Sequence, residues 1–266
     1  MRQQDGIAFK IWAIVYPVAM YYAAITIGIF IAQLIFGSGN ESYMICKIIG
    51  SLVAIPVVYS EYKHDLMRDG KYGAKPHFSA EKCVNILAVI GITVCISISL
   101  NNLISMSPLV QMSEEYQNAS DAFYGSTIWM ELLGSALITP FLEELLHRGV
   151  VYGRLRKMMG IWPSVFVSAL IFAILHFNIV QFIYAFLLGS VFAIFVEKTG
   201  RLYPAVVAHI VANAIAVVRT ETGFLLGTVD GSAFAWMVSV GLCVAGVIGL
   251  VIYVVAMNKR KIEGCK

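Results

Sequence analysis

The sequence predicts an all-α, polytopic membrane protein with about eight transmembrane helices, folded as a single transmembrane domain over residues 1–266. Of these residues 59% are hydrophobic and only 13% are charged, whereas charged residues make up about 25% of a typical soluble domain. The mean hydropathy is +0.79. A membrane-spanning helix needs about 20 mostly apolar residues, and apolar runs near this length recur along the whole chain.

Eight apolar segments are candidate spans. They cover residues 11–36, 43–60, 84–106, 126–153, 161–177, 180–197, 203–219 and 233–257. The fifth and sixth are short and are separated by little more than Asn178 and Ile179, which predicts a tight helical hairpin. The connection 107–125 mixes apolar and acidic residues, so we expect an amphipathic helix at the membrane surface or a loop.

The distribution of Lys and Arg predicts the orientation. The N-terminus, the connections 61–83, 154–157 and 198–201, and the tail 258–261 are basic, whereas the connections 37–42, 107–125 and 220–232 carry acids and no Lys or Arg. Because basic loops are retained in the cytoplasm, we expect a multi-pass protein of the plasma membrane with both termini cytoplasmic. The basic residues are spread over the loops of one side, so no nucleic-acid partner is expected.

Two adjacent carboxylates interrupt the fourth apolar segment. An ionised carboxylate in hydrocarbon is costly, and such residues face a bundle interior and usually serve a function. Glu144 and Arg148 are four residues apart, so we expect them to form an ion pair on one helix face. Glu143 lies about 100° away around the helix and has no local partner. A carboxylate without a local partner is available to act as a general base.

Three further polar residues interrupt later apolar segments. His176 ends the fifth segment, and His209 and Asn213 share one face of the seventh. At 1.5 Å per residue, Glu143, His209 and His176 would lie about 16, 9 and 20 Å from the cytoplasmic ends of their helices. For these side chains to meet, the fifth helix must start deeper, after Pro163, or be strongly tilted. A water between Glu143 and His176 would then be the nucleophile. His209 and Asn213 would donate to the carbonyl oxygen as negative charge develops on it.

These residues form three motifs on successive core segments. The motifs are Glu-Glu-x-x-x-Arg (Glu143, Glu144, Arg148), Phe-x-x-x-His (Phe172, His176) and His-x-x-x-Asn (His209, Asn213). In this order they resemble the signature motifs of the CAAX prenyl endopeptidase type II and bacteriocin-processing (CPBP, or Abi) family of intramembrane proteases. The resemblance covers about residues 126–219.

The resemblance implies an intramembrane endopeptidase with a conical catalytic cavity in its core bundle. By this analogy Glu143 activates water with the help of His176, while His209 and Asn213 stabilise the oxyanion. Glu144 and Arg148 shape the site. The implied partners are membrane lipids and a peptide or protein substrate, with or without a lipid modification, in peptide maturation or bacteriocin self-immunity.

Metal dependence is left open by the residues themselves. The leading interpretation requires no cofactor. The alternative is a zinc site formed by Glu143, His176 and His209, since Zn²⁺ accepts nitrogen and oxygen ligands of this kind. Against zinc, the chain has no HExxH motif, and Arg148 would lie close to the cation.

Two other functions compete with the peptidase. One is a proton-coupled transporter that uses Glu143 and the histidines as a relay, although such proteins commonly show internal repeats and none is visible. The other is a non-catalytic membrane scaffold or immunity protein. For the peptidase we expect a polar cavity that opens to the cytoplasmic side or laterally to lipid. Lys47 and Arg219 are interpreted as topology anchors near helix ends.

Overall fold

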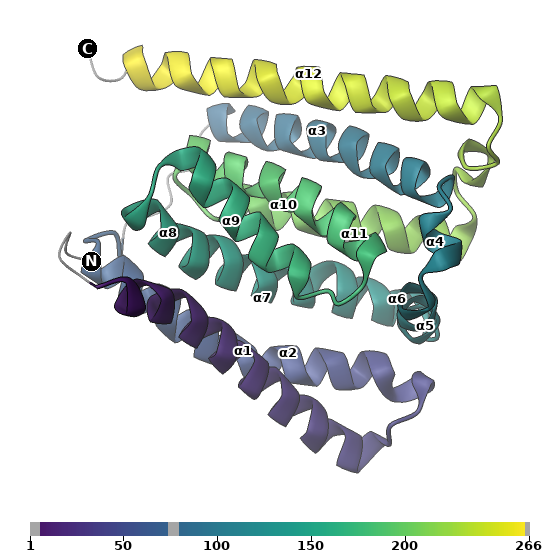
Figure 1. Cartoon of the computed structure of the whole chain (residues 1–266), viewed down its shortest axis with the longest axis horizontal. Coiled ribbons are helices and arrows are strands. Elements are labelled where there is room, and N and C mark those ends of the chain that lie inside the picture. The colour runs from purple at the N-terminus through teal and green to yellow at the C-terminus, as the bar shows by residue number, and fades with distance from the viewer. Residues whose placement is uncertain (1–5, 74–79, 264–266) are drawn as a thin grey trace.

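The computed structural model describes residues 6–73 and 80–263, and every regular element in these ranges is a helix (Figure 1). The predicted all-α fold is confirmed. The helices are α1 (Ile7–Phe36), α2 (Asn40–Arg68), α3 (Ala80–Ser105), α4 (Leu109–Met112), α5 (Glu114–Phe123), α6 (Ile128–Glu131), η1 (Leu132–Ile138), α7 (Thr139–Glu144), η2 (Leu145–Tyr152), α8 (Gly153–Met158), α9 (Ile161–Ile174), α10 (Ile179–Thr199), α11 (Tyr203–Thr222), η3 (Leu226–Thr228) and α12 (Ala233–Glu263).

Six helices of the described residues are long and apolar enough to cross a membrane, namely α1, α2, α3, α10, α11 and α12. The fourth predicted span corresponds to α6 through α8, which follow one another without a break but alternate between α- and π-helical geometry. The fifth corresponds to α9, which has only 14 residues. The count of eight spans therefore stays a prediction.

Two of the expected element boundaries are wrong. The helix α2 continues to Arg68, through residues that were expected to begin a loop at 61. The helix α9 ends at Ile174, so the turn before α10 begins earlier than expected. The connection 107–125, in contrast, contains the helices α4 and α5. The hydroxyl of Ser113 caps the start of α5 by accepting from the backbone N–H of Tyr116.

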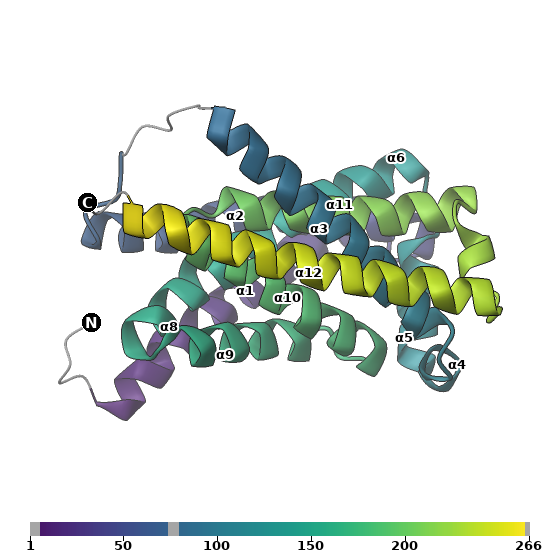
Figure 2. The same ribbon diagram turned by 90° about the horizontal axis from the view of Figure 1, so that it is seen from above.

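The helices are arranged around a central group. The pair α1 and α2 lies along one edge, the pair α3 and α12 lies along the opposite edge, and α6–α8, α9, α10 and α11 fill the space between them (Figures 1 and 2). The start of α1 and the end of α12 lie at the same end of the bundle, and α4 and α5 lie at the other end (Figure 1). The central group thus holds both the carboxylate motif and the two histidine motifs.

The outer faces of the bundle are apolar. The helix α12 exposes Val244, Val247 and Val251, and α1 likewise exposes large aliphatic side chains along its length. Two buried apolar clusters lie inside. One joins α3, α10, α11 and α12, and the other joins α1 and α2 to α7, η2 and α8. An apolar exterior on helices of this length is typical of an integral membrane protein.

Candidate active site

A buried ion pair supports the site from the central helix, which is the continuous segment α6–α8. The guanidinium Nη1 of Arg148 donates to the carboxylate Oε1 of Glu144 at 2.9 Å, and both side chains are 0% exposed. The predicted pair is therefore confirmed. The same carboxylate oxygen also accepts a hydrogen bond of 2.9 Å from Nδ1 of His209 on α11. Glu144 thus ties α11 to the central helix and fixes the orientation of the His209 ring.

The guanidinium of Arg148 fits a space formed by α9 and α10. Its central carbon lies 4.5 Å from the centre of the Phe172 ring and 5.6 Å from that of Phe192. A β-carbon on Gly189 would lie 2.7 Å from Nη2 of Arg148. Only glycine leaves room for the guanidinium at this position, which accounts for a glycine inside α10.

The Phe172 ring organises the imidazoles. Its centroid lies 4.9 Å from those of His147 and His176, and 5.7 Å from that of His209, each in an edge-on arrangement. From the sequence, Phe172 had no expected role beyond its place in a motif. The structure shows that one ring fixes the positions of three histidines and of the Arg148 cation.

Glu143 differs from its neighbour Glu144 in its surroundings. Its side chain is 19% exposed, and its Oε2 lies 3.7 Å from Nε2 of His209, beyond hydrogen-bond distance. Glu143 faces a cavity that also contains His176, His209 and Asn213. As the helical geometry predicted, the more exposed carboxylate has no partner on its own helix, whereas Oε1 of Glu144 bonds to both Arg148 and His209.

His176 lies after the end of α9, not on the helix as expected. The backbone N–H of His176 bonds to the carbonyl of Ala173, three residues back, so the carbonyl of Phe172 is left free for the His176 ring, whose Nδ1 lies 2.9 Å away. The next residue, Phe177, has φ 57°, a conformation that is costly for a residue with a β-carbon. The helix α9 begins at Ile161, before Pro163, so the expected deeper start is wrong, and His176 reaches the site from the turn that follows the helix.

Asn213 contacts the π-helical segment η1. Its amide Nδ2 donates to the carbonyl of Ser135 at 2.9 Å. In η1 the bonds run five residues back, as shown by the N–H of Thr139 bonding to the carbonyl of Gly134. The corresponding donor for Ser135 would be residue 140, which is a proline and has no N–H. Asn213 therefore supplies the missing donor, and the second hydrogen of its amide remains for another acceptor.

The predicted residues meet at one cavity of about 370 Å³. Its lining includes Glu143, His176, His209 and Asn213, which come from three separate segments of the chain. Asn101, Gln181, Tyr184 and Lys47 also line it.

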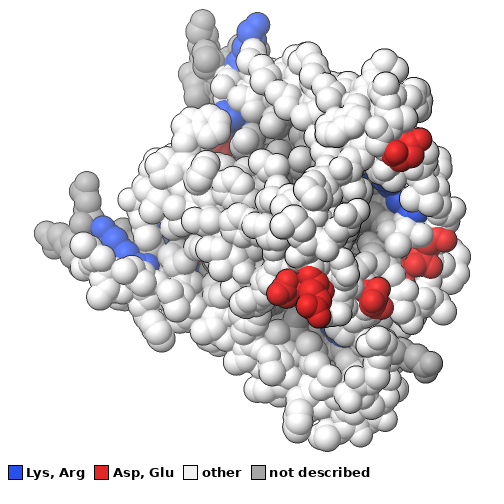
Figure 3. All heavy atoms as spheres, turned by 45° about the vertical axis from the view of Figure 1, so that its right-hand side comes forward, with Lys and Arg blue, Asp and Glu red and all other residues white. Residues whose placement is uncertain are grey.

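The lining of the cavity extends toward one end of the bundle. It continues to Tyr43 on α2, Ser105 on α3 and Tyr116 on α5, all at the end of the bundle away from the described ends of the chain. The expected opening, to the cytoplasmic side or laterally to lipid, stays a prediction. The acidic connections surround the end that the cavity approaches, and Figure 3 shows acidic side chains gathered there.

A zinc site is not preformed by these side chains. In the described part of the chain no group of three or more His, Cys, Asp or Glu residues is placed to hold a metal ion. The ring of His209 is oriented by Glu144, and Nδ1 of His176 is engaged with a backbone carbonyl. These bonds leave Nε2 of both rings without a hydrogen bond among the described residues, as in metal-ligating histidines, so the metal-free interpretation stays a prediction.

The comparisons with known proteins cover the same region. Residues 125–215 match the family model described as type II CAAX prenyl endopeptidase Rce1-like, which includes all three motifs. The chain is also 25% identical over 87 residues to the Bacillus subtilis (strain 168) protein named "Putative membrane peptidase YdiL". That alignment covers 33% of this chain and 36% of the relative, so the likeness spans about a third of the relative's length. No solved structure matches the chain significantly. The resemblance indicated by the motifs is confirmed for this region.

Proposed function

Since residues 125–215 match the Rce1-like prenyl endopeptidase model, we propose that this protein is an intramembrane endopeptidase that hydrolyses a peptide bond with a water activated by Glu143. The observation that carries the proposal is the convergence of Glu143, His176, His209 and Asn213 on one cavity. Addition of water to a carbonyl requires a general base, a group that orients the water and donors for the oxyanion around one space. Glu143, His176 and the pair His209 and Asn213 can fill these roles.

The hydrogen bonds of His176 define its role in this mechanism. A backbone carbonyl only accepts, so Nδ1 of His176 must donate to the carbonyl of Phe172. In the neutral ring Nε2 is then an acceptor and can orient a water molecule. Glu143 takes a proton from that water while the water oxygen bonds to the carbonyl carbon of the substrate. Glu143 later returns the proton to the leaving amine when the C–N bond breaks.

His209 and Asn213 stabilise the oxyanion in the proposal. Because Nδ1 of His209 donates to Glu144, Nε2 faces the cavity and donates to an oxyanion when the ring carries both protons. The free N–H of the Asn213 amide supplies the second donor. Donors of this kind contribute about 3–4 kcal/mol each to the transition state. Glu144 and Arg148 do not touch substrate and act as positioning residues.

The substrate is a peptide or protein that reaches the cavity within or beside the bilayer. The resemblance extends this to lipid-modified substrates, and to peptide maturation or bacteriocin self-immunity as roles. The distribution of charge supports a multi-pass protein of the plasma membrane with cytoplasmic termini. No metal enters the proposed steps.

Cleavage of a mass-encoded peptide library by the purified full chain in lipid nanodiscs tests the proposal. Glu143→Gln keeps the shape of the side chain but removes the base, and should slow cleavage by about 10²- to 10⁴-fold. Glu131→Gln is the matched control, because Glu131 is a fully buried carboxylate of the same central helix and is absent from the cavity lining. Equal rates for Glu143→Gln and the wild type would refute the mechanism. Proton uptake into vesicles without any cleavage would favour a transporter.

A further inference from the structure

Lys47 is a cation inside a predicted membrane span. It lies on α2, seven residues from the helix start, or about 10 Å along the axis at 1.5 Å per residue. A residue placed near a helix end can extend its charge to the membrane surface, which was the interpretation from the sequence. The structure shows instead that Lys47 lines the same cavity as Glu143 and His176.

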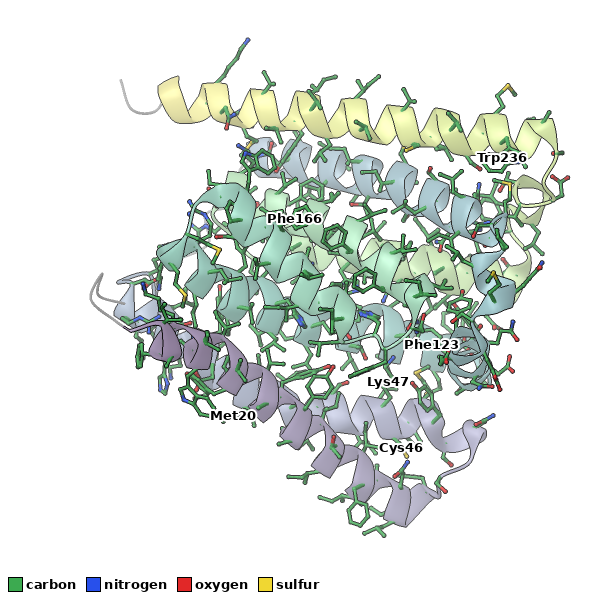
Figure 4. All side chains as sticks on the ribbon, in the orientation of Figure 1. Met20, Cys46, Lys47, Phe123, Phe166 and Trp236 are labelled. Carbon is green, nitrogen blue, oxygen red and sulfur yellow. The ribbon has the colours of Figure 1, made fainter. Side chains whose placement is uncertain are left out.

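Among the described side chains, Lys47 has an aromatic contact but no counter-ion. Its ammonium lies 4.6 Å from the centre of the Phe123 ring, and Figure 4 shows these two side chains side by side at the α5 end of the bundle. No carboxylate of the described residues forms an ion pair with it. Arg148 and Arg154, by contrast, are both paired with carboxylates. Arg219 also lacks an ion pair but does not line the cavity.

The cavity connects this ammonium to the catalytic groups. Tyr43, Tyr116 and Phe123 line it together with Lys47, and Glu143 and His176 line the same cavity. Lys47 is also close enough to His176 for a Coulombic interaction. The acids of α5, Glu114 and Glu115, are exposed to solvent, where water and salt screen them. Inside the cavity the charge of Lys47 is screened less.

We propose that Lys47 is a specificity-determining residue that binds a carboxylate of the peptide substrate while the water on Glu143 attacks a nearby peptide bond. The carboxylate is either the C-terminus of the peptide or an Asp or Glu side chain. The ammonium supplies three donors, and Phe123 holds it in position through its ring face. This inference rests on the proposed peptidase function, since the carboxylate belongs to the bound substrate.

The test uses one peptide sequence in matched forms. A peptide that the wild type cleaves, or the best binder from the library if none is cleaved, is made with a free C-terminus, with a C-terminal amide, and with its acidic side chains replaced by amides. Cleavage is measured as kcat/KM, and binding is measured separately by fluorescence anisotropy on the Glu143→Gln background. The variants are Lys47→Met and Lys47→Arg. Lys63→Met is the matched control, because Lys63 also lies over an aromatic ring, that of Tyr72, on the same helix but outside the cavity.

The expected result is selective. Lys47→Met should lower kcat/KM and affinity for the carboxylate form by about 10- to 100-fold, the range for a hydrogen bond to a charged group. It should leave the amide form unchanged, and Lys47→Arg should restore most of the loss. If the C-terminal amide removes the effect of Lys47→Met, the carboxylate is the C-terminus. If replacing the acidic side chains by amides removes it, the carboxylate is a side chain.

Other outcomes separate this inference from the peptidase proposal. Equal losses for the carboxylate and amide forms would overturn it, because Lys47 would then act only on Glu143, His176 or the fold. An effect of Lys63→Met as large as that of Lys47→Met would also overturn it. Carboxylate-selective binding that depends on Lys47, without cleavage by the wild type, would support carboxylate binding by Lys47 and refute the peptidase. Absence of binding by every form would refute the inference.

Discussion

Replacement of Gly189 by alanine tests the buried arrangement of Arg148. The new β-carbon would lie 2.7 Å from Nη2 of Arg148 and 3.1 Å from Cδ1 of Phe172. The first distance is about 0.7 Å inside the 3.4 Å at which ordinary contact begins. Because the guanidinium is fixed on its other side by Glu144, it cannot move away without weakening the ion pair.

Two effects of opposite sign decide the result. Overpacking a buried site costs about 1–3 kcal/mol, and complete separation of a buried ion pair costs about 3–5 kcal/mol. Replacing glycine inside a helix gains about 0.5–1 kcal/mol. We therefore expect Gly189→Ala to lower the free energy of unfolding by about 1–2 kcal/mol if the guanidinium shifts but stays paired.

The assay is reversible unfolding of the full chain by SDS in mixed micelles. Gly91→Ala is the control, because Gly91 lies within α3 and a β-carbon there would meet nothing within 4 Å, so this change should be neutral or stabilising. Arg148→Lys removes Nη2, so the penalty of Gly189→Ala should shrink in that background, giving a coupling energy of about 1 kcal/mol or more. A Gly189→Ala variant as stable as Gly91→Ala would refute the described position of Arg148.

Two further predictions concern the catalytic groups. Asn213→Leu should lower the initial cleavage rate by about 10²- to 10³-fold through the loss of one oxyanion donor. It should also lower the free energy of unfolding by about 1–3 kcal/mol, because the carbonyl of Ser135 loses its partner; an unchanged rate would exclude Asn213 from the oxyanion site. Dialysis against a strong chelator should leave cleavage unchanged under the metal-free mechanism, with zinc content followed by mass spectrometry. Activity that is lost with the metal and restored by Zn²⁺ would contradict that mechanism.

Local relationships along single helices could be predicted from the sequence. The Glu144–Arg148 pair follows from helical periodicity, as does the place of Glu143 on a different side of the same helix. The end of α9 was harder to predict from the sequence. The ring of His176 bonds to the free carbonyl of Phe172, and this bond depends on a turn whose strained Phe177 has no glycine or proline to announce it.

Contacts between helices could not be predicted from the sequence. The bond from His209 to Glu144, the fit of Arg148 against Gly189 and the bond from Asn213 to Ser135 each join residues far apart in the chain. Because proline lacks an N–H, Pro140 within the fourth span indicated that a carbonyl in the preceding turn would lack its backbone donor. The sequence nevertheless contained no information on which side chain would meet that carbonyl.

The sequence by itself determined that the chain is helical and apolar, and it placed the acidic, imidazole and amide groups on the central segments. Hydrophobicity and helical periodicity are local properties, so they can be read without a fold. Only the tertiary structure decided that Lys47 faces the cavity and that the cavity extends toward α5. These features depend on helix tilt and on the rotation of each helix about its axis, which are set by packing against neighbouring helices.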